Sequence, residues 1–168
     1  MGHRDRTFVS YAAEDASAWW EMRAWPQEQR IPFDFEDAYD LHAKGDTNRD
    51  LIRRRLRERI GRSRQAVVLV GNRSRAVADN ERNYFFYELD VLTKLGMPIV
   101  VVNLNRGRRV DRARLPAPLA GRYTINVSFD PKIVRHALDT FVAGYAASKA
   151  TQTGPHVYEA HVYEELGL

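Results

Sequence analysis

Two unbroken runs of apolar residues constrain the fold of this 168-residue chain more than any other feature of its sequence. They span residues 66–70 (AVVLV) and 99–102 (IVVV). A strand with one face in water alternates apolar and polar residues, whereas a strand covered on both faces is apolar throughout. Both runs therefore predict central strands of a parallel sheet that has helices packed on each face.

Further strand and helix signals alternate around these two runs. Short stretches rich in aromatic and β-branched residues predict strands at 7–11, 31–35 and 123–129. Helical patterns lie at 13–29, from a capping-box-like 47–50 to Gly61, at 81–95 and at 131–147. The first helix is expected to end or kink at Pro26, and the acidic residues 36–46 are expected to form a loop. This alternation predicts a doubly wound α/β sheet of about five strands.

The chain is short enough for one domain to be the default, and we place that domain at 1–147. Residues 148–168 begin with small polar residues and continue with two similar segments, HVYE at 156–159 and HVYE at 161–164. The echo is too short for a structural repeat. We therefore predict a C-terminal tail that docks on the domain through its Tyr, Val and Leu side chains.

Composition excludes several classes of protein. The chain has no cysteine, which rules out disulfides, thiolate metal sites and a cysteine nucleophile. No apolar stretch approaches the roughly 18 to 20 residues of a membrane helix, and residues 1–11 lack the apolar core of a secretory signal. A cytoplasmic location without a membrane partner is expected.

The net charge of +4 favours small anions such as nucleotides and is too weak to argue for nucleic acid. The predicted helix at 49–60 is rich in arginine, but its arginines surround the helix and are interrupted by Asp50 and Glu58. This distribution is typical of a solvated, salt-bridged surface. We expect no nucleic-acid partner.

Ligands of open α/β sheets bind beyond the carboxyl ends of the strands, so the residues after each predicted strand matter most. They contain no G-x-G-x-x-G motif, no P-loop and no G-x-S-x-G nucleophile elbow. The third strand ends in Val70-Gly71-Asn72 without a phosphoacceptor aspartate. A flavin-binding protein is a further reading, but the loop at 71–75 is a poor phosphate cradle.

Glu88 is the most informative single residue. In a helix its neighbours three and four positions away are Tyr84, Phe85, Val91 and Leu92. A carboxylate among apolar side chains is costly to desolvate, so it is a candidate functional group. The alternative is that Glu88 reaches water or pairs with an arginine.

Four acidic residues cluster after the second predicted strand: Asp34, Glu36, Asp37 and Asp40. A solvated or helix-capping loop explains them best, and a magnesium site is the weaker alternative because their spacing is irregular. We expect no metal site here. His156 and His161 are five residues apart and so do not share a helical face.

The order of these segments resembles the TIR-like domains of the Thoeris antiphage defence system. The resemblance covers about residues 5–145. It rests on residues 6–11 (RTFVSY), 33–40 (FDFEDAYD), 67–71 (VVLVG) and 84–89 (YFFYEL). The acidic loop with Tyr39 and the helix with an aromatic residue four positions before Glu88 are its most specific parts.

This resemblance implies a flavodoxin-like TIR fold that cleaves NAD at the nicotinamide–ribose bond. The catalytic glutamate of the family falls on Glu88. The resemblance places Phe8, Ser10, Tyr11, Asp37 and Tyr84 at the substrate. The family often has tryptophan where this chain has Tyr84, a departure that keeps an aromatic ring. NAD is the substrate, and no cofactor is expected.

In Thoeris systems the TIR-like protein resembles a generator of a signalling nucleotide that a separate effector protein reads. The implied product is ADP-ribose, a cyclic isomer of it or a conjugate, depending on the acceptor. Formation of a homo-oligomer is a further expectation. The alternative is a non-catalytic TIR module that associates through surfaces such as the arginine-rich helix.

Overall fold

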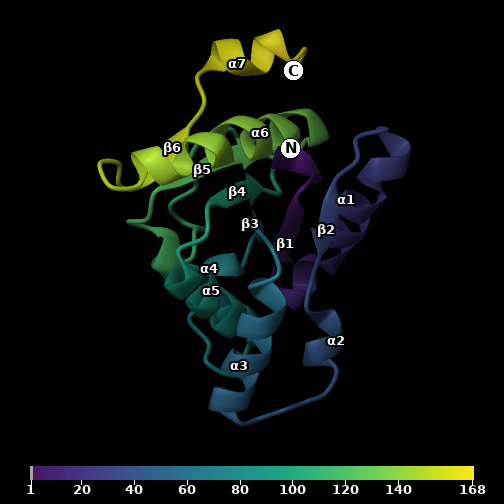
Figure 1. The fold of residues 1–168 in the computed structure, drawn as a ribbon, viewed down its shortest axis with the longest axis vertical. Helices are drawn as coiled ribbons and strands as arrows, with labels where there is room; N and C mark the ends of the chain where they lie inside the picture. Colours follow the sequence, from purple (N-terminus) through teal and green to yellow (C-terminus); the bar gives the residue numbers. More distant parts are fainter. Residues whose placement is uncertain (1) are drawn as a thin grey trace.

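The computed structural model describes residues 2–168, so Met1, the first residue of the predicted domain, lies outside the described part. One parallel sheet of six strands has the order β2-β1-β3-β4-β5-β6. Helices cover both faces of this sheet (Figure 1), as the flavodoxin-like α/β prediction requires. The strands are β1 (Arg6–Ser10), β2 (Asp34–Glu36), β3 (Gln65–Val70), β4 (Ile99–Asn103), β5 (Thr124–Ser128) and β6 (Pro155–Val157).

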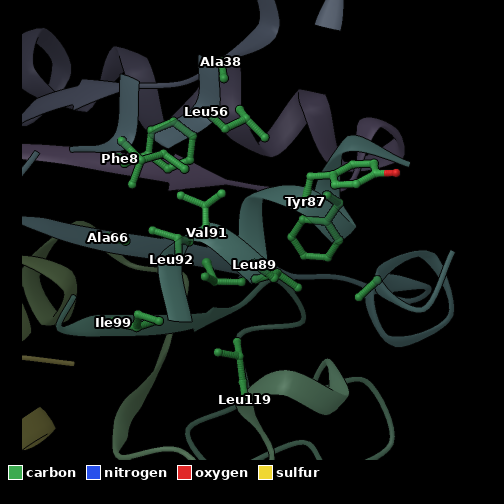
Figure 2. Packing of buried hydrophobic residues seen from close by; sticks show 14 of the residues in the cluster. Phe8, Ala38, Leu56, Ala66, Tyr87, Leu89, Val91, Leu92, Ile99 and Leu119 are labelled. Atoms are coloured by element: carbon green, nitrogen blue, oxygen red, sulfur yellow. The ribbon is translucent and has the colours of Figure 1, made fainter. Parts of the chain in front are cut away.

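The two apolar runs form the central strands β3 and β4, in which every residue is buried. Their side chains alternate between two hydrophobic clusters. One cluster packs the sheet against α3 (Arg49–Ile60) and α5 (Tyr84–Leu95), and Figure 2 shows part of it. The other packs the sheet against α1 (Ala16–Glu28) and α6 (Pro131–Ser148). Burial on both faces explains why neither run contains a charged residue.

Three local expectations need correction. Helix α1 follows the short turn η2 (Ala13–Asp15) and continues past Pro26 to Glu28. Its last turn is held by packing, because the buried Trp25 ring contacts Phe33 and Phe129.

The predicted loop at 36–46 contains the one-turn helix α2 (Tyr39–His42), and α4 (Ser74–Ala78) was not foreseen in the sequence. Two further short turns are η1 (Gly2–Arg4) and η3 (Ala117–Leu119).

Residues 148–168 add structure to both the sheet and one helical layer. Strand β6 pairs in parallel with β5, which raises the predicted five strands to six, and α7 (Ala160–Glu165) follows. The Tyr163 side chain is fully buried, and its hydroxyl accepts a hydrogen bond from the backbone N–H of Ser128 at 3.2 Å. Val162, Leu166 and Leu168 pack against the same cluster as α6. Figure 1 shows this last part of the chain in yellow.

Helix α5 has a defined start, which fixes the helical turn on which Glu88 lies. The Asn83 side chain caps the helix by accepting a hydrogen bond from the N–H of Phe85 at 3.0 Å. We expect Asn83→Ala to lower the free energy of unfolding by about 1 kcal/mol, because the cap is lost. Urea unfolding measures this, with the exposed Asn72→Ala as the control. Equal stabilities of the two variants would contradict the capping role.

Candidate active site

Glu88 lies in the middle of α5 on the side that faces the sheet, and it is only 2% exposed. Its helix is anchored by Phe85, Leu89 and Leu92, which belong to the cluster drawn in Figure 2. A buried carboxylate must be hydrogen-bonded if the fold is to tolerate it. The partners of Glu88 therefore define the site.

Both carboxylate oxygens of Glu88 have a partner. The Ser10 hydroxyl donates to Oε1 at 2.7 Å, and His42 Nε2 lies 2.6 Å from Oε2. Ser10 is the last residue of β1, and His42 is the last residue of α2. The site thus joins the carboxyl end of a strand to two helices. Within residues 2–168, Glu88 is almost fully buried and pairs with a histidine rather than an arginine, so both alternatives from the sequence are wrong.

Tyr84 belongs to the same site through His42. Its ring stacks on the His42 imidazole with the ring centroids 4.3 Å apart. Tyr84 precedes Glu88 by one helical turn, so both side chains are on the same side of α5. The Tyr84 hydroxyl also donates to the backbone carbonyl of Asp46 at 3.3 Å. The aromatic residue predicted beside Glu88 therefore supports the imidazole that contacts the carboxylate.

Tyr11 and Asp37 form a second contact beside the first. The Tyr11 hydroxyl donates to Asp37 Oδ2 at 2.6 Å, and its ring stacks on Trp19. Burial and the hydrogen bond to Asp37 raise the pKa of Tyr11 well above its usual value, so the phenol stays protonated. Arg59 donates to the Asp37 carbonyl at 2.9 Å. These bonds connect the loops that follow β1 and β2.

Phe8 is placed differently from the other predicted substrate residues. Its side chain is fully buried in the cluster below α5, near Val91 in Figure 2. It supports the strand that presents Ser10. Among the arginines near strand ends, Arg75 donates to the backbone carbonyl of Arg112, and Arg73 is exposed.

The acidic residues within and after β2 have separate partners. Asp34 pairs with Arg6 at 3.7 Å, Glu36 accepts from the Ser63 hydroxyl, and Asp40 pairs with Arg59 at 2.8 Å. The hydrogen bond from Arg59 lowers the pKa of Asp40. Among residues 2–168, no three His, Cys, Asp or Glu side chains are grouped as metal ligands.

The sequence reasoning missed His42. It is 46 residues from Glu88 in the chain and sits in a stretch with no periodic pattern. Its one sequence signal is its place within the acidic segment that supplied Asp37. Only the packing of α2 on α5 reveals the contact.

The order in which Ser10, Glu88 and His42 contact one another differs from that of a hydrolytic triad. In a hydrolytic triad the imidazole lies between the hydroxyl and the carboxylate and removes the proton of the hydroxyl. Here the carboxylate of Glu88 lies between Ser10 and His42. Ser10 therefore has no imidazole base, and the three residues do not have the order of a hydrolytic triad.

A family model described as "Thoeris protein ThsB, TIR-like domain" matches residues 8–109, more than half of the chain. The chain belongs to this family. It is thus a TIR-type domain related to antiviral defence, and the matched region of the TIR-like domain includes Ser10, Asp37, His42, Tyr84 and Glu88. Comparison with curated proteins gives no match. No helix described for residues 2–168 combines the length and apolar character that crossing a membrane requires.

The pair of His42 and Glu88 makes the stability of the TIR-like domain depend on pH. Burial lowers the pKa of His42, but the hydrogen bond and charge of Glu88, with the charges of Asp37 and Asp40, outweigh burial and raise it. A raised folded-state pKa stabilises the fold fully below the unfolded value of about 6.5. That contribution disappears as the pH rises through the folded-state pKa.

We therefore expect His42→Gln to lose more stability, relative to the unchanged chain, at about pH 6 than at about pH 9. Urea unfolding at both pH values measures the two differences. His161→Gln is the control, because it removes a largely exposed imidazole. The same loss at both pH values for His42→Gln would show that the ionic pair does not form in solution.

Proposed function

We propose that this TIR-like domain cleaves the bond between nicotinamide and ribose in NAD. The observation that carries the proposal is the buried Glu88 carboxylate, held by Ser10 and His42 at the carboxyl end of β1. Ligands of parallel α/β sheets bind at this end of the strands. Membership of the Thoeris TIR-like family supports the same reading.

The reaction needs stabilisation of positive charge more than proton transfer. The nicotinamide of NAD is already a cationic leaving group, so no general acid is required to expel it. As the bond breaks, positive charge develops on the ribose, as in other glycosyl transfers. A fixed carboxylate in a site with little water stabilises such a cation more strongly than water does. Glu88 is the residue that meets this need.

Ser10 and His42 position the carboxylate. The Ser10 hydroxyl fixes Oε1, and the ring of His42, supported by Tyr84, fixes Oε2. A ribose hydroxyl would replace His42 as the donor to Oε2 when substrate binds. Tyr84 and Tyr11 then lie where they can contact the planar ring of the leaving group.

The acceptor of the ribosyl cation determines the product. Water gives ADP-ribose, attack from within the molecule gives a cyclic isomer, and a small nucleophile gives a conjugate. We propose that the product is a signalling molecule derived from ADP-ribose that activates a separate effector protein. This assignment follows the Thoeris family and not a particular residue of the site.

The alternative is a non-catalytic interaction module. The arginine-rich helix α3 was its proposed surface, but four of the arginines pair within the chain, with Glu81, Asp90, Asp46 and Asp40. This pairing matches the salt-bridged surface predicted for α3. It leaves less free charge for a partner and favours the catalytic reading.

The test measures nicotinamide release from NAD by chromatography. The purified protein is assayed, together with extracts of phage-infected and uninfected cells that express it. Mass spectrometry of the same extracts identifies the product. Nicotinamide release in any of these settings supports the proposal, and unchanged NAD in all three contradicts it.

A further inference from the structure

A basic loop that lines two cavities lies away from Glu88. The loop spans residues 104–112 after β4, and its last seven residues contain four arginines and one aspartate. A cavity of about 570 Å³ lies between this loop and the C-terminal segment, lined by Arg108, Arg109 and residues that include Tyr158. A second cavity of about 620 Å³ is lined by Asn103 and by residues of the loop, among them Arg108 and Arg109.

The backbone of the loop is fixed by buried and long-range hydrogen bonds. The Asn103 side chain is 2% exposed and donates to the carbonyls of Gly107 at 3.1 Å and Arg109 at 2.8 Å. Arg75 donates to the carbonyl of Arg112 at 3.0 Å. The loop is therefore ordered before any ligand arrives, which reduces the entropic cost of binding.

Most of the positive charge of the loop is not neutralised, since within residues 2–168 only Arg106 among its four arginines pairs with a carboxylate, that of Glu21 at 3.9 Å. In the described chain, no carboxylate lies within 4 Å of the guanidinium groups of Arg108, Arg109 or Arg112. Asp111 pairs with Arg114, outside the loop. Arg108 lies over the ring of Tyr163, 4.2 Å from its centroid, which holds the guanidinium beside the first cavity. Arg108 and Arg109 are exposed and have no carboxylate partner among the described residues, so their guanidinium groups are free to bind a phosphate ligand.

The first cavity also has an apolar wall. Val157 is 42% exposed, and Val110 and Tyr158 line the same space. Glu159 is there as well, 3.4 Å from His161. The two guanidinium groups and the apolar wall together suit a ligand that carries both an anion and a flat ring.

We propose that the cavity between loop 104–112 and residues 157–163, here named the arginine pocket, binds a nucleoside diphosphate. The phosphates lie on Arg108 and Arg109, and the base packs on Val157 and Tyr158. This ligand combines the negative charge that the guanidinium groups lack with the planar ring that the apolar wall accepts.

The arginine pocket is separate from the Glu88 site. Glu88 contacts β1, whereas the pocket is formed beyond β4 and beside β6, which lie two and four strands from β1. Strands are about 4.8 Å apart, so the two sites are roughly 10 to 20 Å from each other across the sheet. Residues 157–163 also lie outside the region matched by the family model. The inference therefore does not rest on NAD cleavage.

Isothermal titration calorimetry with ADP, pyrophosphate and adenosine tests the inference on the full chain. The test variant carries Arg108→Gln and Arg109→Gln. The matched control carries Arg62→Gln and Arg64→Gln, two exposed arginines beside the amino end of β3, which removes the same charge from the opposite end of the strands. Thermal unfolding checks that both variants remain folded, and Glu88→Gln is titrated in parallel.

We expect ADP to bind more tightly than pyrophosphate or adenosine. The test variant should weaken ADP binding at least tenfold, and the control variant and Glu88→Gln less than twofold. Equal weakening by test and control variants would show a general charge effect and overturn the proposal. So would loss of ADP binding in Glu88→Gln, no ADP binding at millimolar concentration, or a single-stranded oligonucleotide that displaces ADP at lower concentration.

Discussion

Glu88→Gln is expected to lower the rate of nicotinamide release from NAD about a hundredfold or more, which corresponds to about 2.7 kcal/mol of transition-state stabilisation. Glutamine keeps the size and shape of the side chain but removes the charge that would face the ribosyl cation. The amide still has an oxygen for Ser10 or a donor for His42, so the fold should persist. Turnover of NAD by variant and unchanged chain, measured at equal concentration, gives the ratio.

The control for this experiment is Glu58→Gln, which removes a carboxylate from an exposed position on α3. It should retain the full rate. Circular dichroism and thermal unfolding confirm that Glu88→Gln remains folded. If folded Glu88→Gln releases nicotinamide at the original rate, the carboxylate is not the stabilising group and the proposed mechanism is wrong.

The largest expected effect on stability is that of Tyr163→Ala. The ring of Tyr163 is fully buried between α7 and the sheet, and its hydroxyl accepts the N–H of Ser128. Removal of a buried aromatic side chain costs about 3–5 kcal/mol, since it leaves a cavity that the surroundings fill only in part. Denaturant unfolding of the full chain measures the loss.

Two variants separate the contributions in this measurement. Tyr163→Phe keeps the ring and leaves the Ser128 N–H without its acceptor, which should cost about 1–3 kcal/mol. Tyr39→Ala truncates a tyrosine that is 67% exposed and should change stability by about 0.5 kcal/mol or less. If Tyr163→Ala also stays within this range, residues 160–165 do not remain packed on the domain in solution.

The sequence predicts the central part of the fold because burial leaves a local signature. Residues 66–70 and 99–102 are apolar at every position, and both became strands covered on two faces. The three-residue strand β6 has no such signature, since its place is set by pairing with β5. The turn α2 and the passage of α1 through Pro26 likewise depend on packing and not on local propensity.

In the candidate site too, local features could be predicted from the sequence, whereas contacts between distant elements could not. The apolar neighbours of Glu88 within one helix are visible in the sequence, and they indicated its burial. The partner His42 comes from another element, so no local pattern connects the two residues. Ser10 and Tyr11 were placed at the substrate by the resemblance to the Thoeris TIR-like domains. Their actual contacts, to Glu88 and Asp37, required the tertiary structure.

The strand added by the C-terminal segment has a consequence for self-association. Open sheets can polymerise when a second chain adds its backbone to an outer strand. In this protein one outer strand is β6, which is only three residues long and begins with Pro155, a residue with no amide hydrogen to donate. Addition of a second chain along β6 is therefore disfavoured, and so is fibre growth across this side of the molecule.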